Sequence, residues 1–95
     1  MNLSPLDPLL HSQLRLAIMS ILVSVDEANF VYIKEKTEAS AGNISVQLEK
    51  LSKAEYILIT KSFKDKRPNT TCKITKKGVA AFEKYVEDLK GYIGQ

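Results

Sequence analysis

The feature that most constrains this sequence is a break of three residues, Glu38-Ala39-Ser40, between two segments with helical character. The segment before the break predicts a short helix over 30–37. Ser40 is a good N-cap for the segment after it, because its hydroxyl can accept a hydrogen bond from a backbone N–H of the first helical turn. A helix is therefore expected over 41–55. Two helices joined by so short a turn form a helix-turn-helix pattern.

The region before this motif predicts another helix. Apolar residues recur with the spacing of one helical face from Leu14 to Val25. Asp7-Pro8 has the features of a helix start, and Ser12 offers a second start that would split the region into a short turn and a longer helix. The segment 26–29 is expected to end this helix.

The region after the motif predicts a hairpin and a long helix. The segments 56–63 and 70–75 are rich in β-branched and aromatic residues, and Asp, Pro and Asn lie between them. Thr75 can cap a final helix whose apolar residues continue to the end of the chain. The expected fold is therefore mainly α-helical with one β-hairpin, in a single domain spanning 1–95.

Composition excludes several classes of protein. The sequence has one cysteine and one histidine, so it cannot form an internal disulfide and offers no metal-ligand cluster. Cys72 lies in a strand pattern and is expected to be a packed thiol. No Gly-rich phosphate loop or paired carboxylates mark an enzyme, and no cofactor is expected. No apolar run is long enough to cross a membrane and no leader is recognisable, which favours a cytoplasmic protein.

Charge is distributed unevenly along the chain. Residues 36–78 contain ten Lys and Arg against four Asp and Glu, a net charge of +6, although the whole chain carries only +3. The segments on either side are mildly acidic. This distribution is typical of a domain with one positively charged working face.

The helix predicted over 41–55 has an outer face suited to a DNA major groove. With Ile44 pointing to the core, a rotation of 100° per residue places small residues outside at the N-terminal end and lysines toward the C-terminal end. Asn or Gln there can bind adenine, and Lys can bind guanine or phosphate. The candidate DNA-binding residues of this segment are Ser40, Gly42, Asn43, Ser45, Val46, Gln47, Lys50 and Lys53. A plain solvated helix face is the alternative.

The tip of the predicted hairpin, at 63–70, adds Lys64, Lys66 and Arg67 to this list. Lysines on an edge hairpin also protect against aggregation, so their presence alone does not indicate DNA. A hairpin that directly follows a helix-turn-helix extends beside the second helix, however, and its tip can then contact phosphates or the minor groove. Asp65 can orient Arg67 through a charge-assisted hydrogen bond.

Five short segments, in this order, resemble the MarR-like winged helix-turn-helix transcriptional regulators, in particular a compact subgroup of about one hundred residues. The segments are LRLAIM (14–19), SAGNIS (40–45), LEKL (48–51), DKRP (65–68) and ITKKG (74–78). The resemblance covers about 6–92 and implies a three-helix DNA-binding core, a wing hairpin and a long C-terminal helix. It places Gly42, Asn43, Ser45, Val46, Gln47 and Lys50 on the recognition helix, and Lys64, Lys66 and Arg67 on the wing.

The resemblance further implies a homodimer that binds double-stranded DNA at a pseudo-palindromic operator, mainly as a repressor. Thr75 and Gly78 match the start of the helix after the wing, a structural role. The extra terminal helices of longer regulators, which there help to form the dimer and an effector pocket, are absent, so the mode of dimerisation and any small-molecule effector stay open.

Dimerisation also has a rationale in the apolar residues near both ends of the chain. A chain this small cannot easily bury two such surfaces by itself. The alternative is that they close the core of the monomer. The candidate dimer residues are Leu6, Leu9, Leu10, Leu14, Phe82, Tyr85, Val86, Leu89, Tyr92 and Ile93.

Two functions remain after enzymes are set aside. The first is a sequence-specific DNA-binding repressor without enzymatic activity. The second is a winged-helix module that binds another protein, because the fold alone does not determine function.

Overall fold

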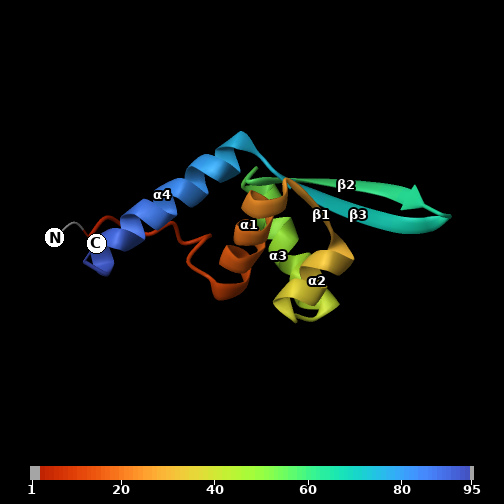
Figure 1. Ribbon diagram of the computed structural model, residues 1–95, viewed down its shortest axis with the longest axis horizontal. Coiled ribbons are helices and arrows are strands. Elements are labelled where there is room, and N and C mark those ends of the chain that lie inside the picture. Colours follow the sequence, from red (N-terminus) through yellow and green to blue (C-terminus); the bar gives the residue numbers. More distant parts are fainter. Residues whose placement is uncertain (1–2, 95) are drawn as a thin grey trace.

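The computed structural model describes residues 3–94, so residues 1, 2 and 95 of the predicted domain lie outside it. The described part forms four helices and three strands (Figure 1). Their order is α1 (Gln13–Val25), β1 (Glu27–Asn29), α2 (Phe30–Thr37), α3 (Ala41–Lys53), β2 (Ile57–Lys64), β3 (Arg67–Ile74) and α4 (Lys76–Tyr92). This is the winged helix-turn-helix order that the sequence predicts, with one additional strand.

The helix-turn-helix forms as expected. Asn29 caps α2 by accepting a hydrogen bond from the backbone N–H of Tyr32, at 2.8 Å. Glu38 ends this helix in the left-handed conformation. The Ser40 hydroxyl then accepts a hydrogen bond from Asn43 N at 3.2 Å and starts α3. Helix α3 ends at Lys53, two positions before the predicted end at 55.

The first helix begins at the second of its two candidate starts. Ser12 caps α1. Before it, the backbone N–H groups of Leu10 and His11 both donate to the carbonyl oxygen of Asp7, which forms only a single turn. The residues from Leu6 to Leu10 therefore belong to an irregular segment before α1. The Tyr56 hydroxyl donates a hydrogen bond of 2.6 Å to Asp7 Oδ2, which raises the pKa of Tyr56 to about 12 and ties this segment to the end of α3.

The sheet contains a strand that the sequence did not predict. The segment expected only to end the first helix contains β1, which pairs antiparallel with β3 from Glu27↔Lys73 to Asn29↔Thr71. The strand order in the sheet is β1-β3-β2. Strand β1 ends beside Thr71, so the outer half of β3 has β2 as its neighbour in the sheet and the hairpin projects as a two-stranded ribbon.

The hairpin tip is tighter than predicted. Instead of a loop over 64–69, Asp65 and Lys66 alone form the turn, and both have positive φ angles, 53° and 65°. Lys64 and Arg67 form the pair that closes this turn. Pro68 is compatible with β3 because it lies beyond β1, at a pair where its missing N–H removes no bond to β2.

The core lies between α1, α2, α3 and one face of the sheet. Its members include Ile44, which was expected to point to the core, and Leu48 and Leu51 on the same side of α3. Cys72 is fully buried in β3, which confirms the packed thiol, and burial raises its pKa to about 11. The remaining buried side chains are Leu10, Ile18, Met19, Leu22, Ala28, Ile33, Ile57 and Tyr85.

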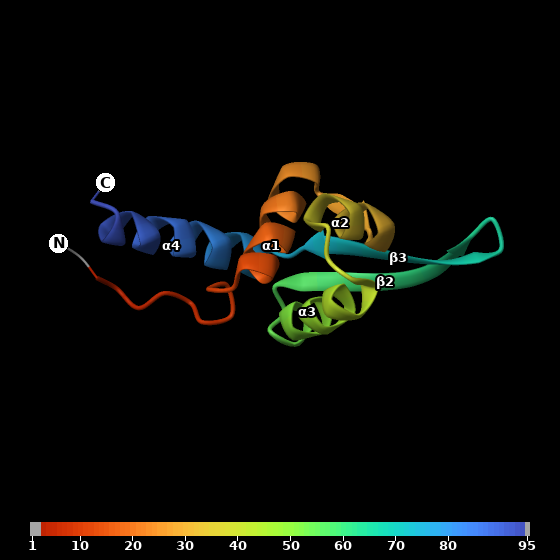
Figure 2. The same ribbon diagram turned by 90° about the horizontal axis from the view of Figure 1, so that it is seen from below.

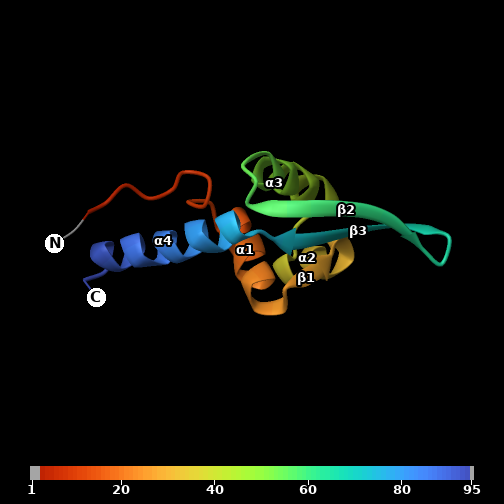
Figure 3. The same cartoon turned by 90° about the horizontal axis from the view of Figure 1, so that it is seen from above.

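The molecule is elongated, with extents of 54, 25 and 21 Å. The hairpin projects from one end, and α4 projects from the other (Figures 1 and 2). The irregular N-terminal segment follows α4 along its length, so both ends of the described chain lie together (Figure 3). The Tyr92 hydroxyl fixes this arrangement by donating to the carbonyl oxygen of Ser4 at 2.8 Å.

Candidate nucleic-acid interface

The outer face of α3 is open to solvent. A Cβ atom added to Gly42 would have no neighbour within 4 Å. One turn further on, Val46 is 50% exposed although it is apolar. A groove-binding helix needs such a surface, because small residues allow close approach of the backbone and an apolar side chain can contact a thymine methyl group.

Cations follow on the same face toward the C-terminal end of α3. Lys50 and Lys53 are both exposed. Glu49, one turn before Lys53, forms an ion pair with it, Lys53 Nζ to Glu49 Oε1, at 3.5 Å. Both side chains of this pair are largely exposed, so the pair is weak and leaves Lys53 able to turn to a phosphate.

The two amides of the recognition helix are held by a chain of hydrogen bonds. Gln47 Nε2 donates to Asn43 Oδ1 at 2.8 Å. Gln47 Oε1 accepts from Arg15 Nη1, in α1, at 2.5 Å, and Arg15 Nε donates to the carbonyl oxygen of Leu9. Gln47 is therefore half-buried beside α1, whereas Asn43 is exposed.

The pleat of the hairpin divides its cations between two faces. Side chains alternate along a strand, so Lys61 and Phe63 share the face of the core residue Ile57, which is the face toward α3. Lys64 and Arg67 form a cross-strand pair on the opposite face. Of the predicted tip cations, Lys64 and Arg67 therefore share one face and Lys66 lies in the turn, whereas Lys61, which the prediction did not include, lies on the other face.

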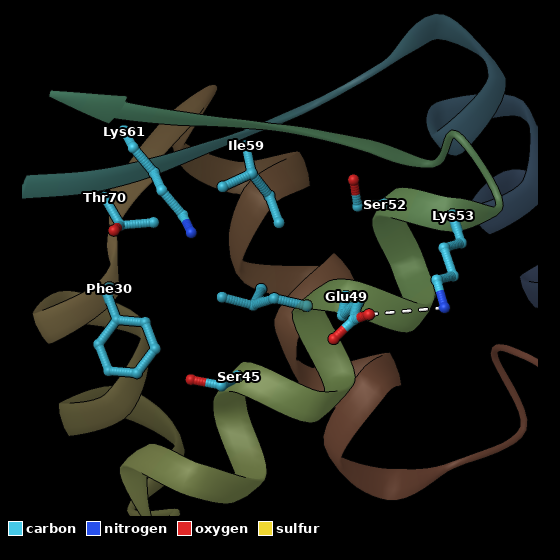
Figure 4. A pocket seen from close by; sticks show the side chains of 9 residues that line it. Phe30, Ser45, Glu49, Ser52, Lys53, Ile59, Lys61 and Thr70 are labelled. Atoms are coloured by element: carbon cyan, nitrogen blue, oxygen red, sulfur yellow. Dashed lines mark ion pairs between the residues drawn. The ribbon is translucent and has the colours of Figure 1, made fainter.

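A groove of about 420 Å³ lies between α3 and the hairpin. Figure 4 shows Lys61 reaching from β2 into this groove, opposite Ser45 and Glu49 on α3. Its lining residues are Phe30, Ser45, Leu48, Glu49, Ser52, Lys53, Ile59, Lys61 and Thr70. The helix and the wing thus border one groove.

Sequence reasoning did not identify Arg15, Lys61 or Phe63. The alternation of Ile57, Ile59 and Lys61 along one strand already contained the signal for Lys61. Phe63 is 78% exposed, which its apolar character did not suggest. Arg15 could not have been found, because its contact with Gln47 spans 32 positions.

The candidate dimer residues fall into two groups. Leu10 is fully buried and Tyr85 is 4% exposed, so both close the chain's own core, and the expectation that they face a partner is wrong. Tyr85 is buried because it packs beneath the N-terminal segment, where its hydroxyl lies 3.0 Å from His11 Nδ1. The others are half-buried or exposed: Leu6, Leu9, Leu14, Phe82, Val86, Leu89, Tyr92 and Ile93.

Other classes of site are not found in the described part of the chain. Residues 3–94 contain no cluster of three His, Cys, Asp or Glu side chains that could hold a metal ion. Among the helices of the same range, none is long and apolar enough to span a bilayer.

Comparisons with known proteins indicate one class of fold. Residues 14–93 match the family model described as a winged helix DNA-binding domain. Uncharacterized protein MJ0432 from Methanocaldococcus jannaschii is 33% identical over 79 residues, which cover 83% of this chain and 86% of that protein. The structure of a transcriptional regulator homologue from Pyrococcus horikoshii OT3 is similar with a TM-score of 0.84 and 27% identity, over 90% of this chain and 85% of that one.

A third similarity concerns the fold alone. The structure of a MarR mutant from E. coli complexed with operator DNA matches with a TM-score of 0.76 and 18% identity. The match covers 93% of this chain and 62% of that protein.

Proposed function

The chain belongs to the winged helix DNA-binding domain family and has the MarR-like fold, and from this premise we propose that it is a homodimeric repressor that reads a pseudo-palindromic operator. The family and fold are those of transcriptional regulators, which are not enzymes. The identity of the contact residues and the two-fold assembly are the further steps of this proposal.

The observation that carries the proposal is the open, positively charged face of α3 beside the groove that the hairpin borders. Gly42 and Val46 leave room for a duplex at the N-terminal end of this face, and Lys50 and Lys53 supply charge at the other. A major groove of B-DNA, about 12 Å wide, accepts a helix of these dimensions. The similar MarR structure with operator DNA supports this mode of binding.

The two pleat faces of the hairpin give the wing a specific role. Lys61 faces α3, whereas Lys64 and Arg67 point to the other side. A minor groove about 6 Å wide has phosphates on both of its walls. A ribbon that enters it with its tip, Asp65-Lys66, therefore presents cations to both strands. In this arrangement the wing fixes position and the recognition helix reads bases.

The projecting α4 supplies the rationale for a homodimer. Leu3, Tyr92 and Ile93 are apolar and are 55%, 44% and 60% exposed at the joined ends of the chain. Val86 continues this exposed apolar surface along α4. A second copy packed against this surface would bury it and place two recognition helices on one face of the DNA, where half-sites lie about 34 Å apart.

Selection of bound duplexes from a random pool tests this function. We expect a two-fold symmetric sequence, bound by two chains and with an affinity that falls steeply as salt rises. Lys50→Ala should weaken binding, whereas Lys90→Ala on α4, whose cation pairs with Glu87, serves as the charge-matched control. Absence of any binding to duplex DNA at low salt would contradict the proposal.

A protein-binding module is the second candidate, and Phe63 is the observation that favours it. This side chain is 78% exposed at the hairpin, beside Pro68 on the partner strand. Exposed aromatic side chains are common anchors of protein interfaces. Loss of DNA binding in Phe63→Ala would support the repressor function. Unchanged DNA binding would favour a role of Phe63 in binding a protein partner.

A further inference from the structure

The hydrogen-bond chain from Arg15 to Asn43 has a fixed direction. A guanidinium group has only donors, so the group of Gln47 that meets Arg15 must be its oxygen. The NH₂ group of Gln47 then points to Asn43, where it requires the amide oxygen as acceptor. Turning either amide over would place two donors against each other. The chemistry of Arg15 therefore determines the orientation of both amides.

Arg15 is itself held firmly. Its Nε donates to the carbonyl oxygen of Leu9 at 2.5 Å, while Nη1 binds Gln47. The carbonyl of Leu9 belongs to the N-terminal turn, where Leu9 N donates to Asp7 Oδ1 at 2.9 Å. Lysine could not replace this contact, because its single ammonium lacks the planar fork that bridges two acceptors at once.

The consequence appears at Asn43, the exposed end of the chain of bonds. Its oxygen accepts a hydrogen bond from Gln47, and within residues 3–94 its Nδ2 group makes no hydrogen bond. Asn43 thus presents a donor to the major groove from the first turn of α3. An asparagine that reads adenine uses its donor and its acceptor together. Here the bond from Gln47 uses one of the two lone pairs of the acceptor and turns the oxygen toward Gln47, so the donor is the group left to point outward.

We propose that Arg15, a residue of α1 outside the contact face, is a positioning residue that turns the donor group of Asn43 outward, and that the base facing Asn43 is one with major-groove acceptors, with guanine favoured. Guanine presents two acceptors, O6 and N7, whereas cytosine presents an N4 donor that would clash with the Asn43 amide. This inference rests on the DNA-binding function proposed above and specifies the readout of that site.

Gln47→Glu provides the sharpest test, because it reverses the chain of bonds without shortening any side chain. The introduced carboxylate would still accept from Arg15, but it has no donor for Asn43. Asn43 must then turn over, donate to the carboxylate and present its oxygen outward. When the sequences selected from a random duplex pool are aligned, one column of the alignment is the base position facing Asn43. The base preferred in this column should change from guanine in the wild type to cytosine or adenine in Gln47→Glu.

Two further variants isolate the role of Arg15. Arg15→Met keeps the stem but releases Gln47, so the preference in this column should fall by roughly tenfold while the other columns and the salt dependence stay close to wild type. Arg15→Lys restores the charge without the fork and should not restore the preference. Asn43→Ala identifies the column and should flatten it in both the wild-type and the Gln47→Glu background.

A measurement without DNA checks the geometry separately. The side-chain NH₂ protons of Gln47 should exchange slowly with solvent in the wild type and rapidly in Arg15→Met, at a temperature where both proteins are folded. An unchanged column in both Gln47→Glu and Arg15→Met would overturn the positioning role while leaving DNA binding intact. Failure of the wild type to bind any duplex would overturn the proposed function itself, together with this readout.

Discussion

The α-carbon of Gly78, in the first turn of α4, lies so close to the carbonyl of Tyr56 that an added Cβ would be 2.1 Å from its oxygen. The same carbonyl accepts a hydrogen bond from Thr75 N at 3.0 Å. The Thr75 hydroxyl donates to the carbonyl of Glu55 at 2.7 Å and accepts from Gly78 N at 2.9 Å. The start of α4 is thus fixed against the end of α3, as the structural role expected of Thr75 and Gly78 requires.

Gly78→Ala should destabilise the protein by about 2 kcal/mol or more, because the methyl group overlaps backbone that cannot move freely. Denaturant unfolding measures the loss. Gly42→Ala is the matched control, since it also lies within a helix but has open space around it. That change should stabilise α3 by up to about 1 kcal/mol. Equal effects of the two substitutions would contradict the close contact at Gly78.

Phosphate contacts of the wing should be visible in the salt dependence of DNA binding. Lys61→Ala and Arg67→Ala remove cations from opposite faces of the ribbon. Each should weaken binding to all sequences and reduce the slope of log affinity against log salt by about one. Lys84→Ala, on α4, is the control and should change neither quantity. A reduced slope in only one of the two wing variants would show that a single face of the ribbon contacts DNA.

Local patterns were sufficient for the helices and the hairpin but not for contacts between distant segments. Ser40, Ser12 and Thr75 each cap a helix, because a cap depends on the few residues that follow it. Strand β1 was missed because three residues of ordinary composition form a strand only where β3 is available to pair with them. The two-residue turn was missed because Asp65 and Lys66 adopt positive φ without glycine.

In the candidate site, too, local patterns were sufficient for some features, whereas others depend on contacts between distant segments. Helical spacing correctly predicted the open face with Gly42 and Val46. It placed Gln47 among the candidate DNA-binding residues but could not show its bond with Arg15, because that bond comes from another helix. Net charge near the hairpin tip was visible in the sequence, but the assignment of Lys64 and Arg67 to one face and Lys61 to the other needed the register.

The apolar end of α4 leads to a prediction on assembly. Ile93→Asp should shift a dimer toward monomer, because a carboxylate in an apolar interface loses its hydration without gaining a partner. Val31→Asp is a matched control, since Val31 is 59% exposed and Ile93 is 60% exposed, but Val31 lies on α2. Sedimentation velocity over a range of concentrations measures the change. Identical sedimentation of both variants and the wild type would exclude α4 from a dimer interface.

The buried thiol of Cys72 makes stability depend on pH in alkaline solution. Burial raises its pKa from 9.0 to about 11, so the folded protein keeps the proton that the unfolded chain releases first. The stabilisation is complete below pH 9 and is lost as pH rises from 9 to about 11. This difference between the thiol pKa values of the folded and unfolded states corresponds to about 3 kcal/mol in the free energy of unfolding.

Cys72→Ala separates this thiol from the other groups that titrate in alkaline solution. The variant is less stable at neutral pH because of the cavity, but it lacks the thiol titration. The gap in unfolding free energy between wild type and Cys72→Ala, measured by urea unfolding, should therefore narrow between pH 8 and pH 10.5. Lysine and tyrosine ionisation affects both proteins alike and cancels in the comparison. A constant gap across this range would mean that the Cys72 thiol ionises as easily in the folded protein as in the unfolded chain.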